Sequence, residues 1–160
     1  MRLHPGRQGE IKTCGLKDHV IILGLGTSGM WDIQHLKALG HQVIVIDEDP
    51  TVIAELRRKQ IPCLRDDGSD ERILMQADAK HARLVIVSLP RISDIINVID
   101  FVKPAPVLAR VFERYDAQLI EKAGGKVILN SEATAQEFLR WFDNQKEELD
   151  TQQIIDAKVV

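Results

Sequence analysis

Short apolar runs alternate with amphipathic segments along most of the chain. The segments between the runs place apolar residues at helical spacing, most clearly over residues 92–102, where Ile recurs at intervals of three and four. Six runs rich in Val, Ile and Leu are predicted as strands: residues 20–23, 41–47, 61–64, 84–89, 107–112 and 126–129. Strands that alternate with helices form a parallel sheet, because each right-handed crossover lays a helix over one face. The pattern predicts an α/β fold: a single Rossmann-type, doubly wound, six-stranded parallel sheet with helices on both faces.

Capping residues and composition divide the chain into three parts. Gly40 ends a helix over 28–39, and Asp49 with Pro50 begins the next one. Residues 1–17 lack periodicity and are predicted to be a flexible lead-in, 18–144 the domain, and 145–160 a polar tail. The last helix follows Ser131 and Glu132, and its apolar residues either cover the sheet or meet a partner subunit: Ala135, Phe138, Leu139, Trp141 and Phe142.

The first predicted strand ends in a glycine-rich loop, Gly24-Leu25-Gly26-Thr27-Ser28-Gly29. In a G-x-G-x-x-G loop the first glycine permits the tight turn and the second lets a pyrophosphate approach the backbone. The third lets the helix pack closely on the strand, and the free N–H groups of that helix face the phosphates. The loop therefore predicts a phosphate site, although the same pattern also suits a tight turn that binds nothing.

Asp47 closes the second predicted strand, 18 residues after Gly29. A carboxylate at this point accepts both ribose hydroxyls of an adenosine. A 2′-phosphate would meet the charges of Asp47, Glu48 and Asp49, so NADP is disfavoured relative to NAD.

Composition and charge exclude several classes of partner. The net charge is −3 and no basic block is present, so a nucleic-acid partner is not expected. The apolar runs are far shorter than the ~20 residues of a membrane-spanning helix, and no signal-peptide core is seen, so we expect a cytoplasmic protein without direct membrane insertion. Cys14 and Cys63 are expected to be free thiols.

Two further charged features invite a functional interpretation. The acidic turn over residues 66–71 lacks the ligand spacing of an EF-hand, and Ser69 or Asp70 can cap the following helix, so no metal site is expected. Arg110 lies inside an otherwise apolar strand and requires a phosphate or a carboxylate nearby. A purely structural pair with an acid across a sheet edge accounts for it equally well.

Several segments together are more specific than the glycine loop alone. They are HVIILGLGTSG, VIVIDEDP, the turn Asp67-Gly68-Ser69-Asp70 with Leu74 after it, LVIVSL, Asn97, and Leu108-Ala109-Arg110-Val111. From about residue 18 to 142 the chain resembles the nucleotide-binding half of the RCK, KTN or TrkA-N regulatory domain of potassium channels and transporters.

The resemblance implies a cytosolic sensor, at the inner face of the cell membrane when bound to a membrane partner. Such a domain forms a homodimer or higher oligomer, often through the helix after the sixth strand, and gates a potassium channel, transporter or cation:proton antiporter. Its ligands include NAD(H), AMP, ADP and ATP. By this resemblance the glycine loop lies at the phosphates: Gly24, Leu25, Gly26, Thr27, Ser28 and Gly29. Asp47 and Glu48 lie at the ribose, Asp67 and Gly68 at the adenine, and Ser88 and Leu89 at the outer edge of the pocket. Arg110 lies near the phosphates or a dimer contact.

The chain departs from that family pattern in three ways. Thr27 stands where many members have an Arg that reaches a phosphate, which shifts the expected preference from triphosphates toward NAD or AMP. Asp66 stands where the family usually has a Gly, directly before the adenine-side Asp67. The second ligand subdomain and transmembrane segments of the family are not found in the sequence, so we expect either a fragment or a stand-alone subunit that docks on a membrane protein.

Two enzyme classes use the same loop. A small NAD-dependent oxidoreductase is the alternative function, but Tyr115 has no Lys four residues later and no substrate domain is evident. A methyltransferase would require a terminal antiparallel hairpin where this chain predicts a helix. The sequence therefore favours a regulatory nucleotide-binding module over an enzyme.

Overall fold

The computed structural model describes residues 16–26, 28–130 and 133–140. Residues 1–15 of the expected lead-in, with Cys14, lie outside the described residues. Thr27, Ser131 and Glu132 also lie outside them, as does the chain from Trp141 onward with the predicted tail. The strands are β1 (Val20–Leu23), β2 (Val43–Asp47), β3 (Cys63–Arg65), β4 (Leu84–Val87), β5 (Val107–Val111) and β6 (Lys126–Leu129). The helices are α1 (Gly29–Ala38), α2 (Pro50–Arg58), α3 (Glu71–Gln76), the 3₁₀ turn η1 (Ala79–His81), α4 (Ile92–Val102) and α5 (Arg114–Lys122).

The six strands form one parallel sheet in the order β3-β2-β1-β4-β5-β6. The chain winds outward from β1 to one edge, returns to β4 beside β1, and winds to the other edge. This order confirms the predicted doubly wound fold. It also creates a switch point between β1 and β4, where the connections leave toward opposite faces and ligands of such sheets bind.

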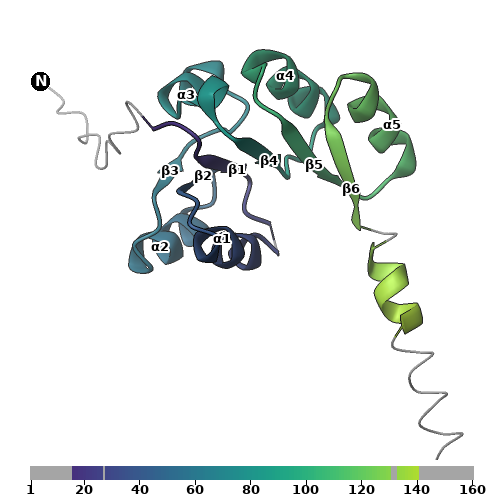
Figure 1. Cartoon of the computed structure of the whole chain (residues 1–160), viewed down its shortest axis with the longest axis horizontal. Helices are drawn as coiled ribbons and strands as arrows, with labels where there is room; N and C mark the ends of the chain where they lie inside the picture. Colours follow the sequence, from purple (N-terminus) through teal and green to yellow (C-terminus); the bar gives the residue numbers. More distant parts are fainter. Residues whose placement is uncertain (1–15, 27, 131–132, 141–160) are drawn as a thin grey trace, which may run out of the picture.

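Helices cover both faces of the sheet (Figure 1). The α1 and α2 helices lie on one face, and α3, α4 and α5 lie on the other. Within β1, Val20 and Ile22 join the core under α1 and α2, whereas Ile21 and Leu23 join the core under α3 to α5. Side chains of a strand alternate between faces, so a central strand with helices on both sides must be apolar throughout.

Hydrogen bonding moves several predicted strand boundaries. The expected third strand, 61–64, is observed at Cys63–Arg65, because only these residues pair with β2. Ile61 is buried, but its N–H donates to the carbonyl of Leu56 and closes the end of α2. The second, fourth and fifth strands are also shorter than predicted: β2 begins at Val43, β4 ends at Val87 and β5 ends at Val111.

Helix boundaries follow the caps closely. Asp49 caps α2 by accepting the N–H of Thr51, with Pro50 in the first helical position as predicted. The first helix is one residue shorter at each end than expected. The buried face of α4 includes Val98 as well as Ile95 and Ile99, while Ile96 is only partly buried. Residues 133–140 are helical, and Phe138 and Leu139 are 58% and 55% exposed.

Candidate nucleotide-binding site

The glycine-rich loop crosses the carboxyl end of the sheet at the switch point. Gly24 has φ +74°, and a Cβ built on it would lie 2.8 Å from the Ser88 carbonyl oxygen that follows β4. A Cβ on Gly29 would lie 2.5 Å from Leu25 Cδ1. These two glycines are therefore required by packing within the protein itself.

Gly26 differs from its neighbours in the loop. Its φ is +58°, yet a Cβ there would find only the Ser88 Cβ, at 4.0 Å. The space above the Gly26 backbone is therefore open, as the approach of a pyrophosphate requires.

The loop leads into the N-terminus of α1. Ser28 is the N-cap residue, but its side chain makes no capping hydrogen bond to the first turn. The first N–H groups of a helix have no partner within the helix itself, and together with the helix dipole they attract anions. This helix end therefore adds to the capacity of the loop to hold phosphate.

Asp47 contacts the glycine loop directly. Its Oδ2 accepts the N–H of Leu25 at 2.8 Å, and its Oδ1 accepts the N–H of Asp49 at 2.8 Å. The first bond ties the end of β2 to the loop after β1. A carboxylate oxygen has two lone pairs, so each oxygen retains an acceptor position toward solvent. The predicted proximity of Asp47 to the loop is confirmed, while its bond to Leu25 is a contact that strand patterns do not reveal.

The turn after β3 packs beside the same loop. Asp67 Oδ1 accepts both the N–H of Ser69 at 2.8 Å and its hydroxyl at 2.7 Å. Gly68 is buried, and a Cβ there would lie 3.2 Å from Leu23 Cβ at the end of β1. The expected adenine-side turn thus lies against the strand that leads into the glycine loop.

The acidic residues of this turn serve the backbone. Asp66 Oδ1 accepts the N–H of Asp67, and Asp70 caps α3 by accepting the N–H of Arg72. Hydrogen bonds from the Arg72 side chain and backbone hold the pKa of Asp70 below its usual value. Among the described residues, no group of three or more His, Cys, Asp or Glu side chains is placed to hold a metal ion.

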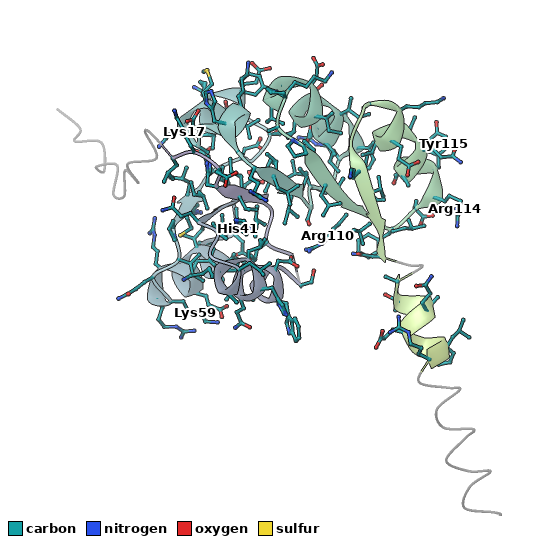
Figure 2. All side chains as sticks on the ribbon, viewed as in Figure 1. Lys17, His41, Lys59, Arg110, Arg114 and Tyr115 are labelled. Carbon is teal, nitrogen blue, oxygen red and sulfur yellow. The ribbon has the colours of Figure 1, made fainter. Side chains whose placement is uncertain are left out.

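Arg110 extends from β5 toward α1, where its Nη2 donates to Asp32 Oδ2 (Figure 2). The Arg110 side chain is 10% exposed and that of Asp32 is 26% exposed. The expected carboxylate partner is therefore present, on a helix and not across a sheet edge. Sequence reasoning missed Asp32; its only signal is an acid in the first turn of the helix after the glycine loop.

Three buried side-chain polar atoms lack hydrogen-bond partners among the described residues; one is His19 Nδ1, just before β1, and two lie toward the carboxyl ends of β4 and β5. These two are Ser88 Oγ, just beyond the end of β4, and Arg110 Nη1. Leu89 follows Ser88, and Glu48 follows Asp47 at the end of β2. Apart from Thr27, the fold brings all the predicted site residues to the carboxyl ends of β1 to β5. Asn97, part of the family resemblance, lies elsewhere, in a groove between α3 and α4.

Known proteins resemble this chain in fold. The TrkA-N domain of the inner membrane protein ybaL from Escherichia coli has a TM-score of 0.72 and 19% identity, over 79% of this chain and 98% of that one. The Kef CTD of Shewanella denitrificans in AMP-bound form has a TM-score of 0.65 and 21% identity, over 75% of each chain. The GsuK channel bound to NAD has a TM-score of 0.64 and 21% identity, over 72% of this chain and 22% of the channel.

Sequence comparison gives the family. No match was found among curated proteins. Among the described residues, none of the helices is both long and apolar enough to cross a membrane. The family model of the TrkA-N domain matches residues 20–131, which is most of the chain and all of the sheet. This protein therefore belongs to the TrkA-N domain family.

Proposed function

We propose that this domain binds an adenine nucleotide, NAD(H) or one of AMP, ADP and ATP, at the carboxyl ends of β1 and β4. The observation that carries the proposal is a pair of buried polar atoms without partners among the described residues, Ser88 Oγ after β4 and Arg110 Nη1 in β5. Buried polar groups are normally hydrogen-bonded, so such atoms indicate a missing partner. A phosphate oxygen over the open backbone of Gly26, where a built Cβ would lie 4.0 Å from Ser88 Cβ, would supply an acceptor for the Ser88 hydroxyl.

The remaining predicted residues have roles around that phosphate position. The free lone pairs of Asp47 would accept ribose hydroxyls, and the turn of Asp67 and Gly68 would border the adenine. Ser88 and Leu89 would form the outer edge. The charges of Asp47 and Glu48 would repel a 2′-phosphate, so NADP is the disfavoured member of the series.

We further propose that ligand binding regulates a potassium channel, a transporter or a cation:proton antiporter. The similar folds include a channel bound to NAD and a Kef domain bound to AMP, which supports a regulatory module over an oxidoreductase. Regulation requires a ligand that distinguishes two arrangements of the protein. The exposed Phe138 and Leu139 of the terminal helix would provide the surface between two copies of this chain.

Thermal unfolding of the purified protein with NAD, NADH, NADP, AMP, ADP and ATP in turn tests the binding proposal. A ligand at 100 times its dissociation constant stabilises the folded state by about 2.7 kcal/mol, enough to raise the unfolding midpoint by several degrees. We expect a rise with at least one of these ligands, and none with NADP.

A matched pair of variants locates the site. Gly26→Val fills the open space over the loop, whereas Gly40→Val changes a glycine of similar φ, +83°, with open space around it at the end of α1. The ligand shift should disappear only in the first variant. No shift with any ligand in the unmodified protein would contradict the proposal.

A further inference from the structure

The ion pair between Asp32 and Arg110 lies at the start of α1, the helix that follows the glycine loop. Its members are 78 residues apart in sequence and join the first turn of α1 to β5. The Arg110 guanidinium is nine-tenths buried and keeps one N–H-bearing nitrogen, Nη1, without a partner among the described residues. Asp32 lies in the first turn of the helix that begins at Gly29 of the glycine loop, and its charge is paired with that of Arg110.

The charges at this position nearly cancel. The N-terminus of a helix carries the equivalent of roughly half a positive charge. Arg110 would add a full positive charge, but Asp32 in the same helical turn removes it. A phosphate at this helix end would therefore interact with the helix dipole and with an N–H of a guanidinium whose charge Asp32 already compensates. The net positive potential for an anion would be weak.

The neighbouring loops strengthen this conclusion. Four acidic residues lie at the carboxyl ends of β2 and β3 or directly after them: Asp47, Glu48, Asp66 and Asp67. The Arg65 side chain at that edge bonds the Glu48 carbonyl. Each additional phosphate on a ligand would increase the repulsion from this edge, since like charges repel.

We propose that Asp32 is a specificity-determining residue that restricts the site to nucleotides of low phosphate charge. The favoured ligands are a nucleoside monophosphate or a dinucleotide, whose bridging pyrophosphate has no terminal phosphate, and the disfavoured ligand is a triphosphate. This inference rests on the proposed nucleotide site. It assigns the discrimination to the charge of Asp32, a residue that contacts Arg110 and no part of the adenosine.

Calorimetric titration with AMP and with ATP tests this role. Magnesium is removed with EDTA, because the metal would neutralise the triphosphate, and the ionic strength is kept constant. The unmodified protein should bind AMP more tightly than ATP. Asp32→Asn should lower the ratio of the ATP to the AMP dissociation constant by about tenfold, the scale of one unit charge beside a phosphate site. Asp32→Glu should restore the original ratio, because it keeps the charge.

A second variant covers the case in which Asp32→Asn fails to fold with Arg110 left unpaired. Arg110→Met keeps the volume and leaves the partly exposed Asp32 charge uncompensated, so it should raise the same ratio by about tenfold. Glu55→Gln is the control, since Glu55 pairs with Lys59 on the surface of α2 and should leave the ratio unchanged. Circular dichroism and the unfolding midpoint verify that each variant is folded.

The outcomes separate this inference from the proposed function. Opposite changes of the ratio in Asp32→Asn and Arg110→Met would support it. Unchanged ratios with AMP binding retained would overturn the role of Asp32 and leave the nucleotide site standing. If the unmodified protein binds none of NAD(H), AMP, ADP and ATP, the proposed function itself fails; if it binds ATP more tightly than AMP, only the role of Asp32 fails.

Discussion

Gly24 closely approaches the backbone after β4, and the cost of filling this space can be measured by adding one methyl group. Gly24→Ala would place a Cβ 2.8 Å from the Ser88 carbonyl oxygen and 3.3 Å from its carbonyl carbon. Both are backbone atoms, and the Ser88 N–H is itself bonded to the Leu23 carbonyl at 2.8 Å. The new methyl group therefore cannot be accommodated by rotating a side chain.

Two costs add at this position. An alanine in the left-handed region, here at φ +74°, costs about 1–2 kcal/mol. Overpacking a rigid region costs about 1–3 kcal/mol more. We expect Gly24→Ala to lower the free energy of unfolding by about 2–5 kcal/mol in total.

Gly40→Ala isolates the first cost. Gly40 has φ +83° and nothing within 4 Å of a built Cβ, so only the backbone penalty of about 1–2 kcal/mol applies. The gain from restricting the unfolded chain is shared by both variants and cancels in their difference. The difference between the variants, about 1–3 kcal/mol, is then the steric cost at Ser88.

Urea denaturation of the two variants and the unmodified protein gives these values. The midpoint should fall further for Gly24→Ala, while the dependence on denaturant stays the same. An equal loss of unfolding free energy in the two variants would show that the loop can move away from β4. That result would refute the tight packing of Gly24 against Ser88.

Three further predictions concern the site, the terminal helix and the buried thiol. Asp47→Ala should weaken AMP binding at least about tenfold in calorimetry. It should also lower the free energy of unfolding by about 1–3 kcal/mol, because it removes the acceptor for the N–H of Leu25. Unchanged AMP affinity would remove Asp47 from the site. Phe138→Glu should convert a dimer into a monomer in light scattering, and a dimer that persists would exclude this helix face as the interface. Burial raises the pKa of the Cys63 thiol, which lowers its thiolate fraction in the folded protein. In a Cys14→Ser background at pH 8, iodoacetamide should therefore react with Cys63 at least about tenfold more slowly in the native than in the unfolded protein. Equal rates would contradict the burial of Cys63.

Much of the fold follows from local pattern. The run of four apolar residues at β1 has to be buried on both faces, and Asp49 with Pro50 begins α2 where capping chemistry requires. Strand ends are less predictable. Ile61 is apolar and buried, yet it closes a helix, because hydrogen-bond pairing with β2 decides which residues are in the strand.

The candidate site was predictable in its components and not in its contacts. Glycine spacing and a terminal acid indicated that the loop and Asp47 come together, because parallel strands bring their carboxyl ends to one edge. The pattern could not show that Asp47 holds the N–H of Leu25, or that Arg110 finds its carboxylate in α1.

The sequence by itself determined the alternation of strands and helices, the glycine loop and the family resemblance, since these depend on residues close together along the chain. Only the tertiary structure decided which groups meet: Asp32 with Arg110 across 78 residues, and Gly24 against Ser88. It also decided that Ser88 Oγ and Arg110 Nη1 are buried without partners among the described residues. The physical reason is that strand order and register set which side chains lie opposite one another, and periodicity within a segment carries no information about its neighbours in space.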